Sequence, residues 1–304
     1  MNLVVGIFLA FIAIFSGSPL VALVLGATLT LLFKSSEKLI QNSTGTLFLQ
    51  IGIILIGLTM SASNAIQLTS TYFPYISIFV VFTFFMGLLI GKISKLDMKL
   101  SLLIASGTAI CGATAIAVVS PLIKAKPKDL LMSLAIIFIF SVISIAIFPI
   151  IGNSIEMSDE SFGAWMAMAI HDTSSVIGAA LSFGGSAAET AATLKLGRTL
   201  WLIPLIIMLG VLFKDDNNKR TKLPLFVLVF ILAIFLGTQL SLNQQTILFL
   251  NDLSTVFLVA ALFCVGTQIN PNSLKEIDLK TIVTASMLWL FALTTSFFLI
   301  NWLQ

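Results

Sequence analysis

Apolar stretches long enough to cross a lipid bilayer follow one another along almost the whole of this 304-residue chain. A helix needs about 20 consecutive, predominantly apolar residues to span the hydrocarbon core. Because backbone groups inside a bilayer must be hydrogen-bonded internally, we expect these segments to be helices. Hydrophobic residues make up 58% of the chain and charged residues 10%. We therefore predict an all-α polytopic membrane protein with one integral membrane domain over residues 1–304.

Polar residues, prolines and glycines divide the chain into eleven apolar segments. The N-terminal run, 3–33, has neither the basic leader nor the cleavage site of a signal peptide, so we expect it to be retained. The predicted segments are 3–16, 18–33, 45–62, 72–92, 101–123, 129–152, 160–184, 187–213, 223–241, 246–267 and 279–302.

Lysines flank the fifth segment on both sides, three at 92–99 and three at 124–128. Basic loops are usually cytoplasmic, and a segment that crosses fully cannot satisfy this rule at both ends. If the fifth and seventh segments both re-enter the membrane, the basic loops at 214–222 and 275–280 are cytoplasmic too, and the acidic loop at 156–160 is outside. The alternative keeps eleven full crossings and one basic loop outside. The charge pattern favours the first version, with 9–11 transmembrane segments and two discontinuous or re-entrant elements.

Two short patterns suggest inverted repeats. The sequence from Gly57 to Ser63 resembles that from Gly266 to Asn272, and each follows an apolar helix. Similar Pro-Leu runs precede both at nearly the same spacing. These pairs would cross the membrane in opposite senses, so we predict approximate inverted halves, 1–125 and 160–304. Transporters built in this way hold their substrate near the midplane at discontinuous helices.

The only histidine, His171, lies in the seventh segment directly before Asp172. Ionisable residues inside a membrane are costly and are usually kept for function. Since imidazole titrates near physiological pH, the two residues could form the protonation switch of a proton-coupled transporter. The structural alternative is a pair that fixes a break in the helix. Adjacent residues point about 100° apart on a helix, so both reach one cavity only if the helix is locally unwound.

Three hydroxyl residues, Thr173, Ser174 and Ser175, follow this pair. Together with backbone N–H groups at a helix N-terminus, they could hold an oxyanion such as sulfate. They could equally bind a sodium ion near Asp172, and sodium is the one metal that we consider. The third alternative is that the hydroxyls donate hydrogen bonds to carbonyl groups of their own helix.

The fifth segment is rich in small and hydroxyl residues around Thr108, Gly112 and Thr114. Such residues allow helices to pack closely. Alternatively, Thr108 and Thr114 could face Thr173 and Ser174 across a shared site.

Lys195 and Arg198 lie about two turns into the eighth segment and share one helix face. Arginine suits bidentate recognition of an oxyanion, and lysine acts as a point charge. With Glu189 nearby, the two cations could balance a divalent anion. The alternative is that both side chains extend to the membrane interface.

Three motifs together resemble the YeiH-like family of bacterial membrane proteins, which are usually labelled as sulfate exporters. They are Ser106-Gly-Thr-Ala-Ile-Cys-Gly-Ala-Thr-Ala-Ile116, Ile170-His-Asp-Thr-Ser-Ser-Val176 and Ala192-Thr-Leu-Lys-Leu-Gly-Arg198. The resemblance covers essentially the whole chain. It implies membership of the cation:proton antiporter and anion transporter superfamily, with inverted repeats and broken helices.

We therefore expect a secondary transporter, and by the family label an exporter, of a small inorganic oxyanion such as sulfate or sulfite, coupled to H⁺ or Na⁺. The alternative is a cation:proton antiporter that uses Asp172. An intramembrane enzyme with Ser174 as nucleophile is disfavoured, because adjacent His and Asp residues poorly support a proton relay to a serine so close in sequence. No cofactor motif or nucleic-acid-binding patch is present in the sequence. We expect a multi-pass protein of the bacterial inner membrane and, by analogy with related carriers, a homodimer.

Overall fold

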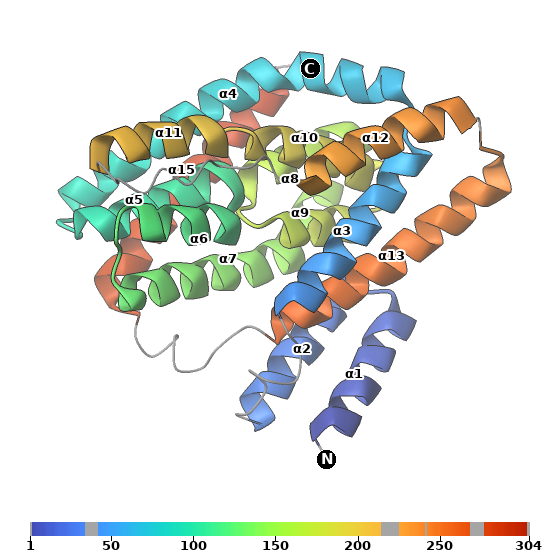
Figure 1. Cartoon of the computed structure of the whole chain (residues 1–304), viewed down its shortest axis with the longest axis horizontal. Coiled ribbons are helices and arrows are strands. Elements are labelled where there is room, and N and C mark those ends of the chain that lie inside the picture. The colour runs from blue at the N-terminus through green and yellow to red at the C-terminus, as the bar shows by residue number, and fades with distance from the viewer. Residues whose placement is uncertain (1, 34–41, 214–224, 241, 268–276, 303–304) are drawn as a thin grey trace.

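The computed structural model describes residues 2–33, 42–213, 225–240, 242–267 and 277–302, and every regular element in these ranges is a helix (Figure 1). The predicted all-α class is therefore confirmed. The elements are α1 Asn2–Ser16, α2 Pro19–Phe33, α3 Asn42–Thr59, α4 Ala62–Ile93, α5 Met98–Ser106, the π-helix η2 Gly107–Cys111, α6 Ala113–Leu122, α7 Pro127–Ser154, α8 Asp159–Ala169, α9 Thr173–Phe183, α10 Ala187–Thr199, α11 Leu202–Phe213, α12 Leu225–Leu240, α13 Gln244–Gly266 and α15 Leu279–Trp302.

Five helical stretches in the described part of the chain are long and apolar enough to cross a membrane by themselves: α4, α7, α10 with α11, α13 and α15. Large apolar side chains, such as Ile78, Phe85 and Phe298, are exposed on their outer faces. Such extended apolar surfaces are expected where helices contact lipid. The chain is thus a multi-pass membrane protein, as predicted.

Two predicted segments differ from the observed helices. The segment predicted at 72–92 begins ten residues earlier, at Ala62, because α4 continues through a more polar first part that hydropathy does not detect. The segment predicted at 187–213 is interrupted at residues 200–201, where α10 ends and α11 begins.

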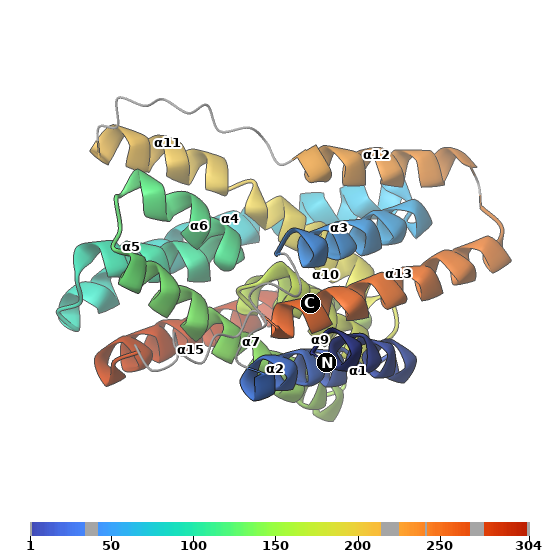
Figure 2. The same ribbon diagram turned by 60° about the horizontal axis from the view of Figure 1, so that its bottom comes forward.

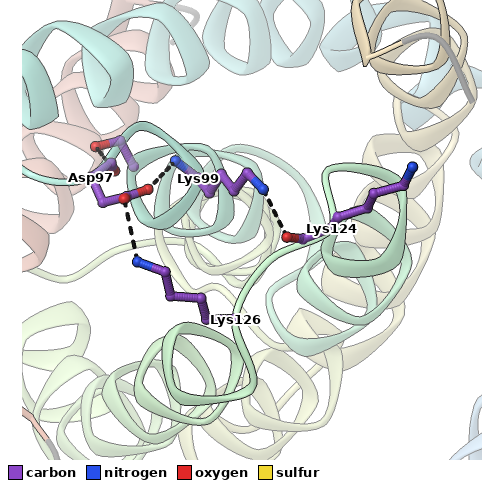
Figure 3. Close-up of polar contacts among 5 residues, drawn as sticks. Asp97, Lys99, Lys124 and Lys126 are labelled. Atoms are coloured by element: carbon purple, nitrogen blue, oxygen red, sulfur yellow. Dashed lines mark hydrogen bonds and ion pairs between the residues drawn. The ribbon is translucent and has the colours of Figure 1, made fainter.

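The fifth predicted segment folds as a helical hairpin, α5–η2–α6, whose two ends lie together. The Lys99 ammonium donates to the Lys124 carbonyl oxygen at 2.8 Å, and Lys126 forms an ion pair with Asp97 at 3.8 Å (Figure 3). Lysines from before and after the segment therefore lie at the same face of the molecule. This arrangement excludes a full crossing and supports the re-entrant version.

The seventh predicted segment folds in the same way, as the hairpin α8–α9. The Ser186 backbone N–H, just after α9, donates to the carboxylate of Asp159, at the start of α8, at 2.9 Å. The rings of Phe162 and Phe183 stack across the hairpin with centroids 4.0 Å apart. Because α7 links the base of the first hairpin to the base of the second, and its 28 residues span about 42 Å, the two hairpins enter from opposite sides.

The helices form two groups (Figures 1 and 2). One contains α1, α2, α3, α12 and α13, and α3 and α13 pack side by side along their length. The other contains α4 and α15 together with both hairpins, α7 and α10. Helices of the first group approach so closely that a Cβ on Gly26 of α2 would overlap with the backbone of α13, and one on Gly237 of α12 with the backbone of α3.

These paired contacts fit the inverted halves, 1–125 and 160–304, which stay a prediction. Part of the motif at 266–272 and the predicted basic loop 214–222 lie outside the described residues, as does the start of the loop at 275–280.

Candidate functional site

The tips of the two hairpins meet in the interior. We call this meeting point, residues 107–112 and 170–172, the tip junction. Gly112 has a φ of +58° and a ψ of −120°, where the chain turns from η2 into α6. A Cβ at this position would lie 3.1 Å from both the Asp172 amide nitrogen and the His171 carbonyl carbon. Glycine is therefore required for its conformation and for the close approach of the other hairpin.

Each hairpin tip leaves backbone carbonyl groups without helical partners. In the second hairpin, α8 ends at Ala169, Ile170 is extended, and α9 begins at Thr173. The last carbonyls of a helix cannot bond within it, and inside a membrane they must find other donors. The C-terminal ends of η2 and α8 thus bring free carbonyls and partial negative charge to the tip junction.

Arg198 of α10 supplies these donors. Its Nε donates to the Ala109 carbonyl oxygen at 2.8 Å, and its Nη2 donates to that of Thr108. Its Nη1 contacts the carbonyl oxygens of Ala167 at 2.8 Å, Met168 at 2.7 Å and Ile170 at 3.4 Å. One guanidinium group therefore ties both hairpin tips to α10.

Lys195 lies one turn earlier on the same helix, and its ammonium donates to the Ile170 carbonyl oxygen at 2.7 Å. Both cations are 0% exposed. The alternative that they extend to the membrane interface is therefore wrong. The predicted shared face is correct, and the structure places it against the tip junction.

Asp172 is the N-terminal cap of α9. One carboxylate oxygen accepts hydrogen bonds from the Ser174 hydroxyl, from the Ser175 hydroxyl at 3.2 Å and from the Ser175 backbone N–H at 3.2 Å. The serine hydroxyls thus bond to the cap of their own helix, while Thr173 is half-buried. Asp172 also lies close enough to Lys195 to interact with it electrostatically.

His171 points to a different environment. It is 1% exposed, and its ring packs on Phe140 of α7, with centroids 5.8 Å apart, and near Trp289 of α15 at 6.3 Å. Its Nδ1 is buried and makes no hydrogen bond to any described residue. In particular, no hydrogen bond joins His171 to Asp172 in this part of the chain. The local unwinding that the His-Asp pair requires is present, but the structure does not bring the imidazole onto the carboxylate.

The fifth-segment threonines contribute less than expected. Thr108 is buried and takes part through its carbonyl oxygen rather than through its hydroxyl. Thr114 is exposed on the first turn of α6. Among the described residues, no hydrogen bond joins Thr108 or Thr114 to Thr173 or Ser174, so a shared site between these hydroxyls stays a prediction.

Several contributors to the site could not be predicted from the sequence. The carbonyl groups of Ala109, Ala167 and Met168 depend on where the helices stop, which residue type does not reveal. Trp289 of α15 packs in the interior against Phe140, with ring centroids 4.5 Å apart. No group of three or more His, Cys, Asp or Glu side chains suited to a metal ion occurs in the ranges that the structure describes.

The sequence is similar to a group of bacterial membrane proteins. A family described as "Conserved hypothetical protein 698" matches residues 3–285. A UPF0324 membrane protein of Photobacterium profundum is 38% identical over 269 residues, which cover 88% of this chain and 82% of the relative. One from Vibrio vulnificus is 35% identical over 286 residues, covering 93% and 91%. One from Bdellovibrio bacteriovorus is 30% identical over 294 residues, covering 94% and 90%.

No solved structure significantly matches this chain. The match to the family extends over both hairpins and α10, so the tip junction lies within the matched region. The chain therefore belongs to the family described as conserved hypothetical protein 698, whose curated relatives are named UPF0324 membrane proteins.

Proposed function

We propose that this protein is a secondary active transporter of a small inorganic oxyanion, such as sulfate or sulfite, coupled to H⁺ or Na⁺ and acting as an exporter. The observation that carries the proposal is the burial of Lys195 and Arg198 where the two hairpin tips meet. The YeiH-like resemblance points to the same substrate class.

The charges at the tip junction favour an anion. Two buried cations, Lys195 and Arg198, bind the carbonyl groups of the junction, and the carboxylate there is that of Asp172, which interacts electrostatically with Lys195. Four helix ends also meet here: the C-termini of η2 and α8 and the N-termini of α6 and α9. Their partial charges of roughly −0.5 and +0.5 cancel in pairs. One positive charge is left, and because uncompensated charge is costly inside a membrane, a bound anion would be stabilised.

The donors that remain suit an oxyanion. The three nitrogens of Arg198 all donate to carbonyl oxygens, so this residue acts by its charge and by holding the tips. An ammonium group has three N–H donors, and Lys195 uses one of them for Ile170. The first turn of α6, which follows Gly112, has no side-chain cap, unlike that of α9. We place the substrate between Lys195 and this helix N-terminus.

The hairpins supply a route for alternating access. They enter from opposite sides, and their tips form the layer between the two sides. A carrier needs a central site that faces one side at a time, and discontinuous helices at the midplane are a recurring way to build it. His171 is buried beside the junction, and its Nδ1 makes no hydrogen bond to any described residue, so it is our candidate for the coupling proton.

A second candidate function is cation:proton antiport. The specific observation in its favour is the cluster of oxygens formed by the Asp172 carboxylate with the Ser174 and Ser175 hydroxyls. Oxygen ligands of this kind suit Na⁺. In this case Lys195 would compete as an internal cation.

Transport into proteoliposomes tests the proposal. Labelled sulfate and sulfite are offered with and without a pH gradient to the wild type and to His171→Ala, Lys195→Met and Glu156→Gln. We expect gradient-dependent anion uptake that loses its pH dependence in His171→Ala and falls at least about tenfold in Lys195→Met, which corresponds to about 1.4 kcal/mol. Glu156, which is exposed and far from the tip junction, is the charge-removal control, and Glu156→Gln should leave uptake unchanged. Absence of anion uptake together with Na⁺/H⁺ exchange would overturn the proposal in favour of antiport.

A further inference from the structure

A group of lysines gathers at the base of the first hairpin, far from the tip junction. We call this group the lysine collar; it consists of Lys92, Lys95, Lys99, Lys124, Lys126, Lys128 and Lys280. It comes from the end of α4, both ends of the α5–α6 hairpin and the starts of α7 and α15. Three aspartates lie among the seven lysines, at 97, 129 and 278. The collar therefore has a clear excess of positive charge.

Specific contacts hold the collar together. Lys99 donates to the Lys124 carbonyl oxygen at 2.8 Å, and Lys280 of α15 donates to the Lys95 carbonyl oxygen. Lys126 pairs with Asp97 (Figure 3). The lysines belong to one arranged surface rather than to separate mobile loops.

Two of these lysines occupy backbone positions that favour glycine. Lys95 has a φ of 53° and Lys124 a φ of 51°. Each follows a helix in a cap arrangement in which the next N–H donates to the carbonyl five residues earlier. Leu96 donates to Gly91 and Ala125 to Ser120, both at 2.9 Å. Glycine is the usual residue at such positions because it avoids the steric penalty of a Cβ. Lysine therefore keeps a cationic side chain at two positions where glycine is the usual residue.

Apolar side chains lie next to the charges. Ile93 is 70% exposed, Met98 66% and Leu279 77%. Each of the three is the immediate neighbour of a collar lysine in the sequence. Each of these residues is the first or last residue of a helix. A basic surface with apolar residues beside it suits an amphiphile with an anionic head.

From this arrangement we infer that the lysine collar binds the phosphate headgroup of an anionic phospholipid, whose acyl chains lie against Ile93, Met98 and Leu279. Phosphate chemistry alone would also fit a free anion; the exposed apolar neighbours assign the lipid. The inference is independent of the proposed transport function, because it involves no residue of the tip junction.

Thermal unfolding of the purified protein with added lipid tests the inference. Phosphatidylglycerol should raise the Tm of the wild type by about 4 °C or more relative to the same amount of phosphatidylcholine. The triple variant Lys95→Gln, Lys124→Gln, Lys126→Gln should lose at least half of this difference. The same three positions changed to Arg, which keeps the charge, should retain it.

Two controls separate lipid binding from folding. Glu156 has the same kind of backbone, with a φ of 53°, at the opposite end of α7, and Glu156→Gln should leave the lipid effect intact. Lys95→Gly removes the charge and relaxes the backbone, so it should reduce the lipid effect without lowering the Tm in phosphatidylcholine. Equal stabilisation by both lipids, an undiminished effect in the triple Gln variant, or an equal shift with inorganic phosphate alone would each overturn the inference.

Discussion

At the scale of single residues, the tip junction depends on side chains and backbone positions that no other residue type can replace without losing hydrogen bonds or creating steric overlap. Arg198 is the clearest case among the cations. It reaches freed carbonyl groups on two hairpins that approach from opposite sides. Hydrogen bonds to charged groups contribute roughly 1.5–3 kcal/mol each, and here they also satisfy carbonyls that the membrane would leave without partners.

Gly112 is the most constrained backbone position. Gly112→Ala should destabilise the protein by about 2–4 kcal/mol, because a residue with this φ is strained and its Cβ would press on backbone atoms of His171 and Asp172. Chemical or thermal unfolding in detergent measures the effect. Gly210 of α11 has open space around it, so Gly210→Ala should be neutral or stabilising. Equal unfolding curves for the wild type and Gly112→Ala would show that the hairpin tips do not meet as closely as described.

Part of the site was predictable from residue type. An ionisable pair in an apolar segment directed attention to His171 and Asp172, and the spacing of three placed Lys195 and Arg198 on one face. The partners were not predictable. Whether Arg198 meets a substrate or a helix end depends on where α8 stops, and Ala169 is as good a helix former as its neighbours. Likewise, the direction of the His171 ring is set by Phe140 and Trp289, which are distant in the sequence.

At the scale of elements, loop charge carried more information than hydropathy. Hydropathy described the fifth and seventh segments as ordinary spans, and only the lysines on both sides of the fifth segment indicated re-entry. The helix breaks at a different kind of residue in each hairpin. In the first it breaks at Gly112, which has a positive φ, and in the second at Ile170, which is extended. Neither cause is visible as a drop in hydrophobicity, so the helix ends could not be located from the sequence.

Labelling of introduced cysteines tests the two hairpins. Lys99→Cys and Lys126→Cys should react with a membrane-impermeant maleimide from the cytoplasmic side alone, because the hairpin α5–α6 returns to the side from which it entered. Glu156→Cys and Ser186→Cys should react from the opposite side alone. Background reaction should be low, since Cys111 and Cys264 are both buried. Labelling of positions 99 and 126 from different sides would be incompatible with re-entry.

At the scale of the whole molecule, the helices separate into a group with few ionisable residues and a group that contains the tip junction. The first group is held by close contacts between backbones, and these contacts occur twice. In one, α2 meets α13 at Gly26 and Gly266; in the other, α12 meets α3 at Gly237 and Gly57. The order of these helices along the chain, α2–α3 and then α12–α13, is what inverted halves would produce.

This symmetry makes a quantitative prediction. Gly26→Ala and Gly237→Ala each place a Cβ against a backbone carbonyl, of Phe263 and of Leu58 respectively, and neither carbonyl can rotate away as a side chain would. Each substitution should therefore destabilise the protein by about 1–3 kcal/mol, by similar amounts for the two, and their effects should add in the double variant because the sites share no contact. Gly6→Ala of α1, where a Cβ would meet only Leu29 at an ordinary 3.4 Å, is the matched control. Thermal unfolding of the four variants measures these effects. If one glycine tolerates alanine while the other does not, the two contacts are not equivalent, and the division into inverted halves loses its structural support.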